Sequence, residues 1–261
     1  ATRLRLYHTG AIVPGNDADI QLVEDLKHPK PEVVIKDGNI VYEDNKFKVE
    51  IPAYIIPEDL KGSVNVKTVT TDDFKITVPV SKGFKGGTAI INTMKQDGSS
   101  IYTKLVQKEV NISEEHDGKA VVETSPYLKM AVFNRYGTYK HSLGIIDGMS
   151  NVQGAIAITY GHDAHNLTVY GGNDEDMAVA ANAVIQSNGG ICAVRNQKVL
   201  SLIPLPMAGL LSDLSIEDLY QEMKQLLLHA EEMGFVHQNL LTFLTLMTLA
   251  VSPEVKLSDL G

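Results

Sequence analysis

Hydrophobic and polar residues follow regular periods over most of this chain, most clearly from Gly154 to Gly190. Small and β-branched residues at 154–160 and 167–170 predict two short strands. Asn173 can cap the helix that follows, and the glycines at 189–190 end it. Because so short a connection makes the two strands neighbours, the polar turn between them is expected at the rim of a sheet. Working groups are commonly placed on such loops.

The remainder of the C-terminal half, residues 126–261, predicts a mixed α/β domain. Apolar runs indicate a strand at 128–134 and a hairpin formed by 190–195 and 198–203. Leucine, methionine and alanine repeat at helical spacing between Ser215, a potential cap, and Gly234. A last buried helix is expected at 240–249, and a glycine-rich segment at 144–148 precedes the two strands.

The first half of the chain is predicted to be rich in strands. Residues 1–52 begin with what looks like the end of a helix (1–7) and continue as a small meander with a hairpin turn at Asp37-Gly38. Residues 53–125 form a β-rich connecting region with alternating segments. These segments are 64–69, 74–80, 88–94 and 101–110. The predicted fold class is therefore α+β, a β-rich N-terminal part before a mixed α/β domain, with no complete barrel.

Composition narrows the possible partners and surroundings. The net charge is −9 and the basic residues form no stripe, which argues against nucleic acid or an anionic membrane. The one cysteine, Cys192, excludes an internal disulfide and suits a reducing cytoplasm; it is interpreted as a buried, unreactive thiol. The chain starts with Ala1 rather than Met, so it is expected to be part of a longer polypeptide.

The turn between the first two strands carries most of the candidate chemistry: His162, Asp163, His165 and Asn166. On a continuous strand the two histidines would point to opposite faces, and their spacing is not that of a zinc-protease helix. In a turn they could converge on a metal, with Asp163 orienting one ring. The preferred interpretation is a hydrogen-bonded turn that is structural or contacts substrate, without a metal on this chain.

Two groups of residues resemble known enzymes. The segment Gly-Ala-Ile-Val-Pro-Gly-x-x-Ala-Asp-Ile-x-Leu-Val at 10–23, with Val-Ile-Lys-Asp-Gly-Asn-Ile-Val at 34–41, resembles the tail of amidohydrolase-superfamily enzymes. In that superfamily a metal-bearing barrel is followed by strands that complete a β-sandwich. The resemblance implies that residues 1–52 are such trailing strands.

The C-terminal half resembles the domain that follows the barrel in bacterial adenine deaminases. The motifs, in the expected order, are Met130-Ala-Val-Phe-Asn-Arg-Tyr-Gly137, Gly154-Ala-Ile-Ala157, His162-Asp-Ala-His-Asn166, Asp174-Glu-Asp-Met177, Gly189-Gly-Ile-Cys-Ala-Val-Arg-Asn196 and Leu205-Pro-Met-Ala-Gly-Leu-Leu-Ser212. The resemblance implies hydrolysis of adenine to hypoxanthine and ammonia by a hydroxide on a divalent metal (Mn, Fe or Zn) in the parent enzyme. It also implies that a barrel domain, which holds the metal ligands, is missing from this chain.

This sequence departs from the family pattern at Asn134, where the family usually has a glutamate before Arg135. No catalytic metal ligand can be carried onto this chain, which is expected to be inactive alone and to bind no cofactor. Its expected role is to support or cover the active site of a cytoplasmic, homo-oligomeric enzyme that binds a purine base. Arg135 joins the turn as a candidate site residue. The alternatives are a non-catalytic ligand-binding or assembly module, or the tail of another amidohydrolase such as a deacetylase or cyclic amidase.

Overall fold

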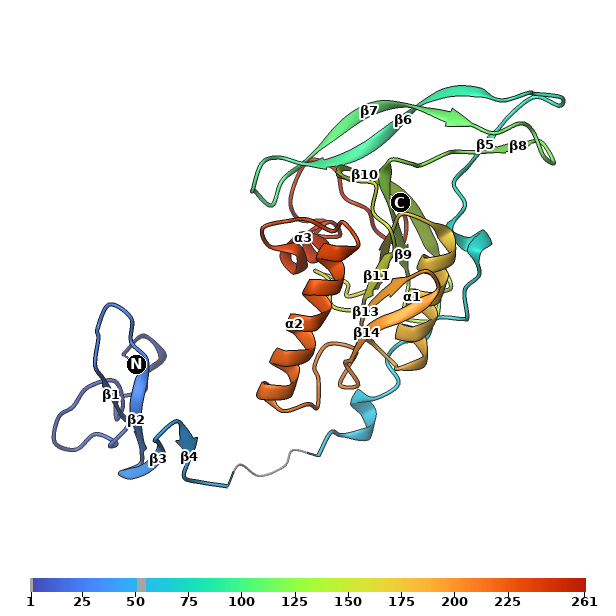
Figure 1. The fold of residues 1–261 in the computed structure, drawn as a ribbon. Helices are drawn as coiled ribbons and strands as arrows, with labels where there is room; N and C mark the ends of the chain where they lie inside the picture. The colour runs from blue at the N-terminus through green and yellow to red at the C-terminus, as the bar shows by residue number, and fades with distance from the viewer. Residues whose placement is uncertain (1, 51–54) are drawn as a thin grey trace. The chain divides into compact units, whose positions relative to one another are not determined.

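A computed structural model describes residues 2–50 and 55–261, and the chain divides into two compact units, residues 1–55 and 56–261 (Figure 1). Strands dominate the first unit, while the second combines a large sheet with three α-helices. The predicted α+β class is therefore confirmed. Within the two described stretches no sheet closes into a barrel.

The first unit is an antiparallel meander of four strands in the order β1-β2-β3-β4. Their bounds are Ile20–Val23, Pro31–Lys36, Asn39–Glu43 and Lys46–Phe47. The turn between β2 and β3 places Asp37 and Gly38 at φ 49° and 79°, the pair of positive angles that a two-residue type I′ turn requires. The hairpin prediction is thus confirmed. The predicted helix end at 1–7 is wrong for the described residues, which form only the 3₁₀ turn Thr2–Leu4.

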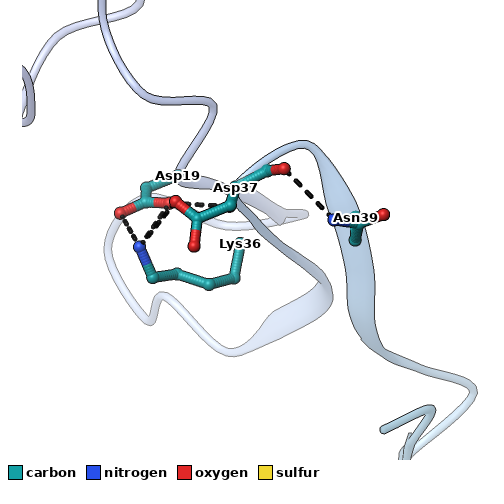
Figure 2. A network of polar contacts seen from close by, with 4 residues as sticks. All are labelled: Asp19, Lys36, Asp37 and Asn39. Atoms are coloured by element: carbon teal, nitrogen blue, oxygen red, sulfur yellow. Dashed lines mark hydrogen bonds and ion pairs between the residues drawn. The ribbon is translucent and has the colours of Figure 1, made fainter.

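A polar network holds the segment before β1 against this hairpin (Figure 2). The Lys36 ammonium donates to both carboxylate oxygens of Asp19, at 3.0 and 2.8 Å, and the Asp37 backbone N–H donates to Asp19 Oδ1 at 3.0 Å. The Asp37 hydrogen bond and the Lys36 charge lower the pKa of Asp19. The groups are exposed, so the network fixes local geometry rather than adding much stability.

The second unit is built on an eight-stranded sheet with the order β14-β13-β11-β12-β9-β10-β6-β7. Its strands, in chain order, are β6 Gly87–Gln96, β7 Thr103–Ile112, β9 Tyr127–Phe133, β10 His141–Ser150, β11 Ala155–Ile158, β12 Leu167–Gly171, β13 Gly190–Arg195 and β14 Lys198–Pro204. All neighbours are antiparallel except β10 and β6. Strands from 53–125 and from 126–261 therefore share one sheet.

Helices cover both faces of this sheet (Figure 1). On one face, α1 (Asp174–Gln186) packs over the side chains of Ala131, Phe133 and their neighbours. On the other, α2 (Ile216–Glu232) and α3 (Leu240–Leu246) pack over alternate residues such as Met130 and Val132. The central strands β9, β11, β12 and β13 are buried on both faces because each face is covered by a helix layer. None of the helices in the described part of the chain has the length and apolarity of a membrane-crossing segment.

The predicted caps are present. The Asn173 side chain accepts from the Asp176 N–H at 2.8 Å, and Ser215 Oγ accepts from the Asp218 N–H at 3.1 Å. Each cap satisfies one backbone donor of the first helical turn. Gly234, at φ 92°, follows the end of α2.

The glycine-rich segment 144–148 lies inside β10, and a Cβ at Gly144 would meet the Leu257 side chain at 3.1 Å. Two further sequence predictions are wrong. Residues 64–69 form only a bridge from Asn65 to Tyr136. Residues 74–80 shorten to β5 (Thr77–Pro79), which pairs with β8 (Lys119–Val121).

The last two differences have a common cause, which is side-chain bonding to the backbone. The amide of Asn182 on α1 accepts from the Val69 N–H at 3.0 Å and donates to the Val69 carbonyl at 2.9 Å. A strand partner is therefore not needed there. Thr70 and Asp73 form a capping box on the 3₁₀ turn Thr71–Phe74, which keeps that segment out of the sheet. A second 3₁₀ turn is Glu58–Leu60.

Candidate functional site

The polar turn joins two adjacent strands at one end of the large sheet. Ile158 of β11 pairs with Thr168 of β12, so residues 159–166 form the loop between them. Leu167 pairs on its other side with Phe133, the last residue of β9. The residues that follow β9 therefore stand beside this loop. The topology brings Arg135 together with His162, Asp163, His165 and Asn166, as the sequence grouped them.

Three aromatic rings form a partly exposed cluster on the loop. The ring of Tyr160 lies 6.3 Å from that of His165 in a stacked arrangement and 5.9 Å from that of His162. The two imidazoles are 5.7 Å apart. The His162 side chain is 45% exposed and Asp163 is 60% exposed, with 4.0 Å between Nδ1 and Oδ1. The histidines converge, but Asp163 points largely to solvent and does not fix an imidazole ring.

Hydrogen bonds from two other segments fix the loop backbone. Thr248 Oγ1 donates to the His162 carbonyl at 2.7 Å, and the Tyr136 hydroxyl donates to the Ala164 carbonyl at 2.6 Å. Within the loop, the Gly161 N–H donates to His165 Nδ1 at 3.3 Å. This bond requires an unprotonated Nδ1. The pKa of His165 is lowered from its ordinary value, mainly by burial and then by the charge of Arg135.

Asn166 connects the loop to β9 and to the C-terminal segment. Its side-chain oxygen accepts from the Arg135 backbone N–H at 3.3 Å, and its amide nitrogen donates to Asp259 Oδ1 at 3.0 Å. The other oxygen of Asp259 accepts from the Asn134 side chain at 2.8 Å. Asn166 is only 6% exposed, so these contacts replace water. Asn166 is thus a structural member of the site.

Arg135 is buried, with 4% of the residue exposed, and its guanidinium is under-satisfied. Nε and Nη1 are both buried without a hydrogen-bond partner among the described residues. A Cβ at Gly209 would lie 2.3 Å from Nη1, so only glycine leaves room for the guanidinium there. The guanidinium carbon also lies 5.4 Å from the centre of the Tyr136 ring. Arg135 is therefore held by packing and not by a salt bridge.

The geometry suits hydrogen bonding and ring stacking. Among the residues that the structure describes, no three His, Cys, Asp or Glu side chains are grouped as metal ligands. Cys192, at the sheet centre, is fully buried, and burial raises its pKa to about 12. The predicted burial of this thiol is confirmed, and the raised pKa is in keeping with an unreactive side chain.

Four residues of the site were not singled out from the sequence: Tyr136, Gly209, Thr248 and Asp259. Gly209 lies in the segment Leu205-Pro-Met-Ala-Gly. A glycine between apolar residues could have indicated a close contact at this position. Thr248 and Asp259 lie more than eighty residues from the loop. Their hydrogen bonds depend on the fold and leave no local pattern in the sequence.

The amino-acid sequence of this chain matches a known protein family. Residues 100–261 match the family described as adenine deaminase C-terminal domain. Adenine deaminase of Clostridium botulinum (strain 657 / Type Ba4) is 37% identical over 266 residues, which cover 98% of this chain and 42% of that protein. Adenine deaminase of Thermosipho africanus is 33% identical, over 100% of this chain and 43% of that protein. Adenine deaminase 2 of Carboxydothermus hydrogenoformans is 35% identical, over 100% and 44%.

This chain spans about two fifths of the length of these relatives, which fits the expectation of a C-terminal portion. The family match covers the loop, Arg135, Gly209, Thr248 and Asp259, so the whole candidate site lies within it. The chain belongs to the adenine deaminase C-terminal domain family.

Proposed function

We propose that this chain is the C-terminal portion of a metal-dependent aminohydrolase that converts adenine and water to hypoxanthine and ammonia. The observation that carries this proposal is the family match together with relatives named adenine deaminase over the whole chain. The metal, manganese, iron or zinc, would be held by the barrel and would supply the attacking hydroxide. The intact enzyme is proposed to be a cytoplasmic homo-oligomer.

Within that enzyme, the loop 159–166 supports or covers the active site. Its rings are partly exposed while its backbone is anchored by Thr248 and Tyr136, which is the combination expected of a preorganised contact surface. Two imidazoles and a tyrosine can stack on a purine and bond to its edge. The loop would meet either the base itself or a barrel loop that holds it.

Residues 1–52 are proposed as trailing strands of the amidohydrolase β-sandwich, 53–125 as the connecting region and 126–261 as the domain that meets the barrel. In support, no described residue of β1–β4 is fully buried, as expected of strands that pair with others. A second candidate is an assembly module. It is supported by large apolar side chains exposed on α2, namely Ile216 at 83% and Tyr220 at 63%.

The test uses the longer polypeptide, with a barrel, beside this chain alone. Adenine loss is followed by absorbance with added Mn²⁺, Fe²⁺ or Zn²⁺. We expect turnover by the longer polypeptide only. In that polypeptide, His162→Ala and His165→Ala should each lower kcat/KM tenfold to hundredfold, about the effect of losing one hydrogen bond to a group that is charged or becomes charged in the transition state. The matched control is His116→Ala, a histidine whose side chain is 93% exposed.

Metal-dependent turnover by this chain alone would contradict the proposed division of labour. Normal kinetics in both folded loop variants would leave the loop an architectural feature. Absence of turnover in a folded, metal-loaded longer polypeptide would favour the assembly module.

A further inference from the structure

We propose that Arg135 is a carboxylate-binding site, filled by a carboxylate from outside the described residues. The inference goes beyond adenine turnover and does not depend on it. It starts from the buried guanidinium of Arg135, two of whose nitrogen atoms have no hydrogen-bond partner among the described residues.

A buried guanidinium is costly unless it is paired. Arg135 is 4% exposed, and its Nε and Nη1 have no partner among the described residues. An arginine side chain does not lose its charge in a protein. Removing that charge from water without a counter-ion is energetically unfavourable. A native fold retains such a group where an anion completes the site.

The described carboxylates near the site contact groups other than the Arg135 guanidinium. Both oxygens of Asp259 accept from the amides of Asn134 and Asn166. Asp163 is 60% exposed and its closest cation is the His162 ring. None of the ion pairs within residues 2–50 and 55–261 includes Arg135.

The surroundings select a carboxylate over a bulky anion. Nη1 packs against Gly209 so closely that a Cβ would not fit, and the guanidinium lies over the Tyr136 ring. The donors of a guanidinium form a planar fork that matches two carboxylate oxygens. Tyr136, whose ring borders the guanidinium, is 57% exposed.

Two sources can supply this group. One is an Asp or Glu side chain of the part of the polypeptide that relatives have and this chain lacks, since the chain covers only 42% of one such relative. The other is a freely diffusing small carboxylate. Both would make charge-assisted hydrogen bonds to the Arg135 guanidinium.

The test follows the Nε–Hε NMR signal of Arg135, assigned by its loss in Arg135→Lys. Sodium acetate is titrated into this chain at constant ionic strength against sodium chloride. We expect a saturable shift of the Arg135 signal with acetate and none with chloride. The matched control signal is that of Arg195, whose Nε is also buried without a partner but whose Nη2 donates to Gln153 at 2.9 Å. It should not move.

A second arm records the same signal in the longer polypeptide without acetate. A signal already shifted, and insensitive to acetate, assigns the carboxylate to a side chain of the added part; a signal that still titrates assigns it to a free carboxylate. The proposal is overturned if neither acetate nor the added part shifts Arg135, or if chloride or the Arg195 signal reproduces the shift. Neither measurement involves deamination. The NMR result can therefore be interpreted even if the proposed deaminase activity is not found.

Discussion

Asp259 accepts a hydrogen bond from the side chain of Asn166 at 3.0 Å, although 93 positions separate the two residues. The same carboxylate accepts from Asn134, the residue next to Arg135. One acidic side chain near the C-terminal end thereby links the end of β9 to the loop before β12. The C-terminal segment is part of the site's architecture.

Replacing Asp259 by alanine should destabilise the second unit. The change removes the acceptor of two amides, one of them on nearly buried Asn166, so we expect a loss of about 1.5–3 kcal/mol in the free energy of unfolding. Urea unfolding followed by circular dichroism measures it. Asp259→Asn should lose less, because one acceptor oxygen remains. The control is Asp213→Ala, an exposed residue on the link to α2; an equal loss there would contradict the assigned role.

Removing the charge at Arg135 should raise the pKa of His165. Burial is the largest cause of the lowered value, followed by the charge of Arg135 and that of His162, while Asp163 opposes them. In Arg135→Gln the imidazolium loses one repulsive neighbour, so the pKa moves upward but stays below its ordinary value because burial remains. NMR titration of the His165 ring measures the shift. Lys67→Gln serves as the control, since Lys67 lies over Tyr139 and not over the loop; an equal shift there would contradict the assignment.

The lowered pKa of His165 also predicts how stability depends on pH. The unfolded chain binds the proton more readily than the folded one, so stability should fall as pH falls below about 6.5 toward the lower folded value. Above that range the contribution is constant. Comparing thermal unfolding of His165→Gln and wild type between pH 5 and 8 isolates it. The slope below pH 6.5 should be shallower in the variant, and identical slopes would contradict the shift.

The two units should differ in amide exchange. The strands β1–β4 contain no fully buried described residue, whereas β9, β11 and β12 are buried on both faces. Exchange in exposed, thin sheets proceeds through local opening. Mass spectrometry after deuterium labelling should therefore show fast exchange at 20–47 and slow exchange at 127–133, 155–158 and 167–171. Uniform protection, or self-association that protects 20–47, would contradict the assignment of unpaired strands.

Gly172 should not tolerate a side chain. A Cβ there would lie 1.9 Å from the Val152 carbonyl oxygen, a backbone atom that cannot turn aside. Gly172→Ala must move the segment before α1 and should cost several kcal/mol, on the scale of core overpacking at about 1–3 kcal/mol or more. The control is Gly87→Ala, where a Cβ would meet only the tip of the Phe84 ring at 3.3 Å. Equal unfolding midpoints for both variants would contradict the contact.

Most elements of the large sheet were predictable because local signals agreed with the tertiary fold. Asn173 and Ser215 cap their helices as their sequences indicate, and Asp37-Gly38 forms the expected turn. The errors occurred where a distant side chain took part. Asn182 satisfies the backbone at Val69 in place of a strand, although the two residues are 113 positions apart.

The candidate site shows the same division. The four polar residues of the loop were recognised because they are adjacent in sequence, and Arg135 because of its motif. Asp259 and Thr248 reach the loop only through the packing of the C-terminal segment and α3. Sequence spacing also left open whether the two histidines converge, since that depends on the backbone of the turn; here their rings are 5.7 Å apart.

The position of Cys192 turns the molecule into its own reporter of unfolding. It is the chain's one thiol, lies fully buried on β13 beneath α1, and has a pKa raised to about 12. A thiol reagent at neutral pH therefore reacts only after the central sheet opens. The rate of labelling at saturating reagent would equal the opening rate of that sheet, without any introduced dye or mutation. Substitutions at Asp259, Gly172 or Arg135 could then be ranked by kinetics as well as by equilibrium stability.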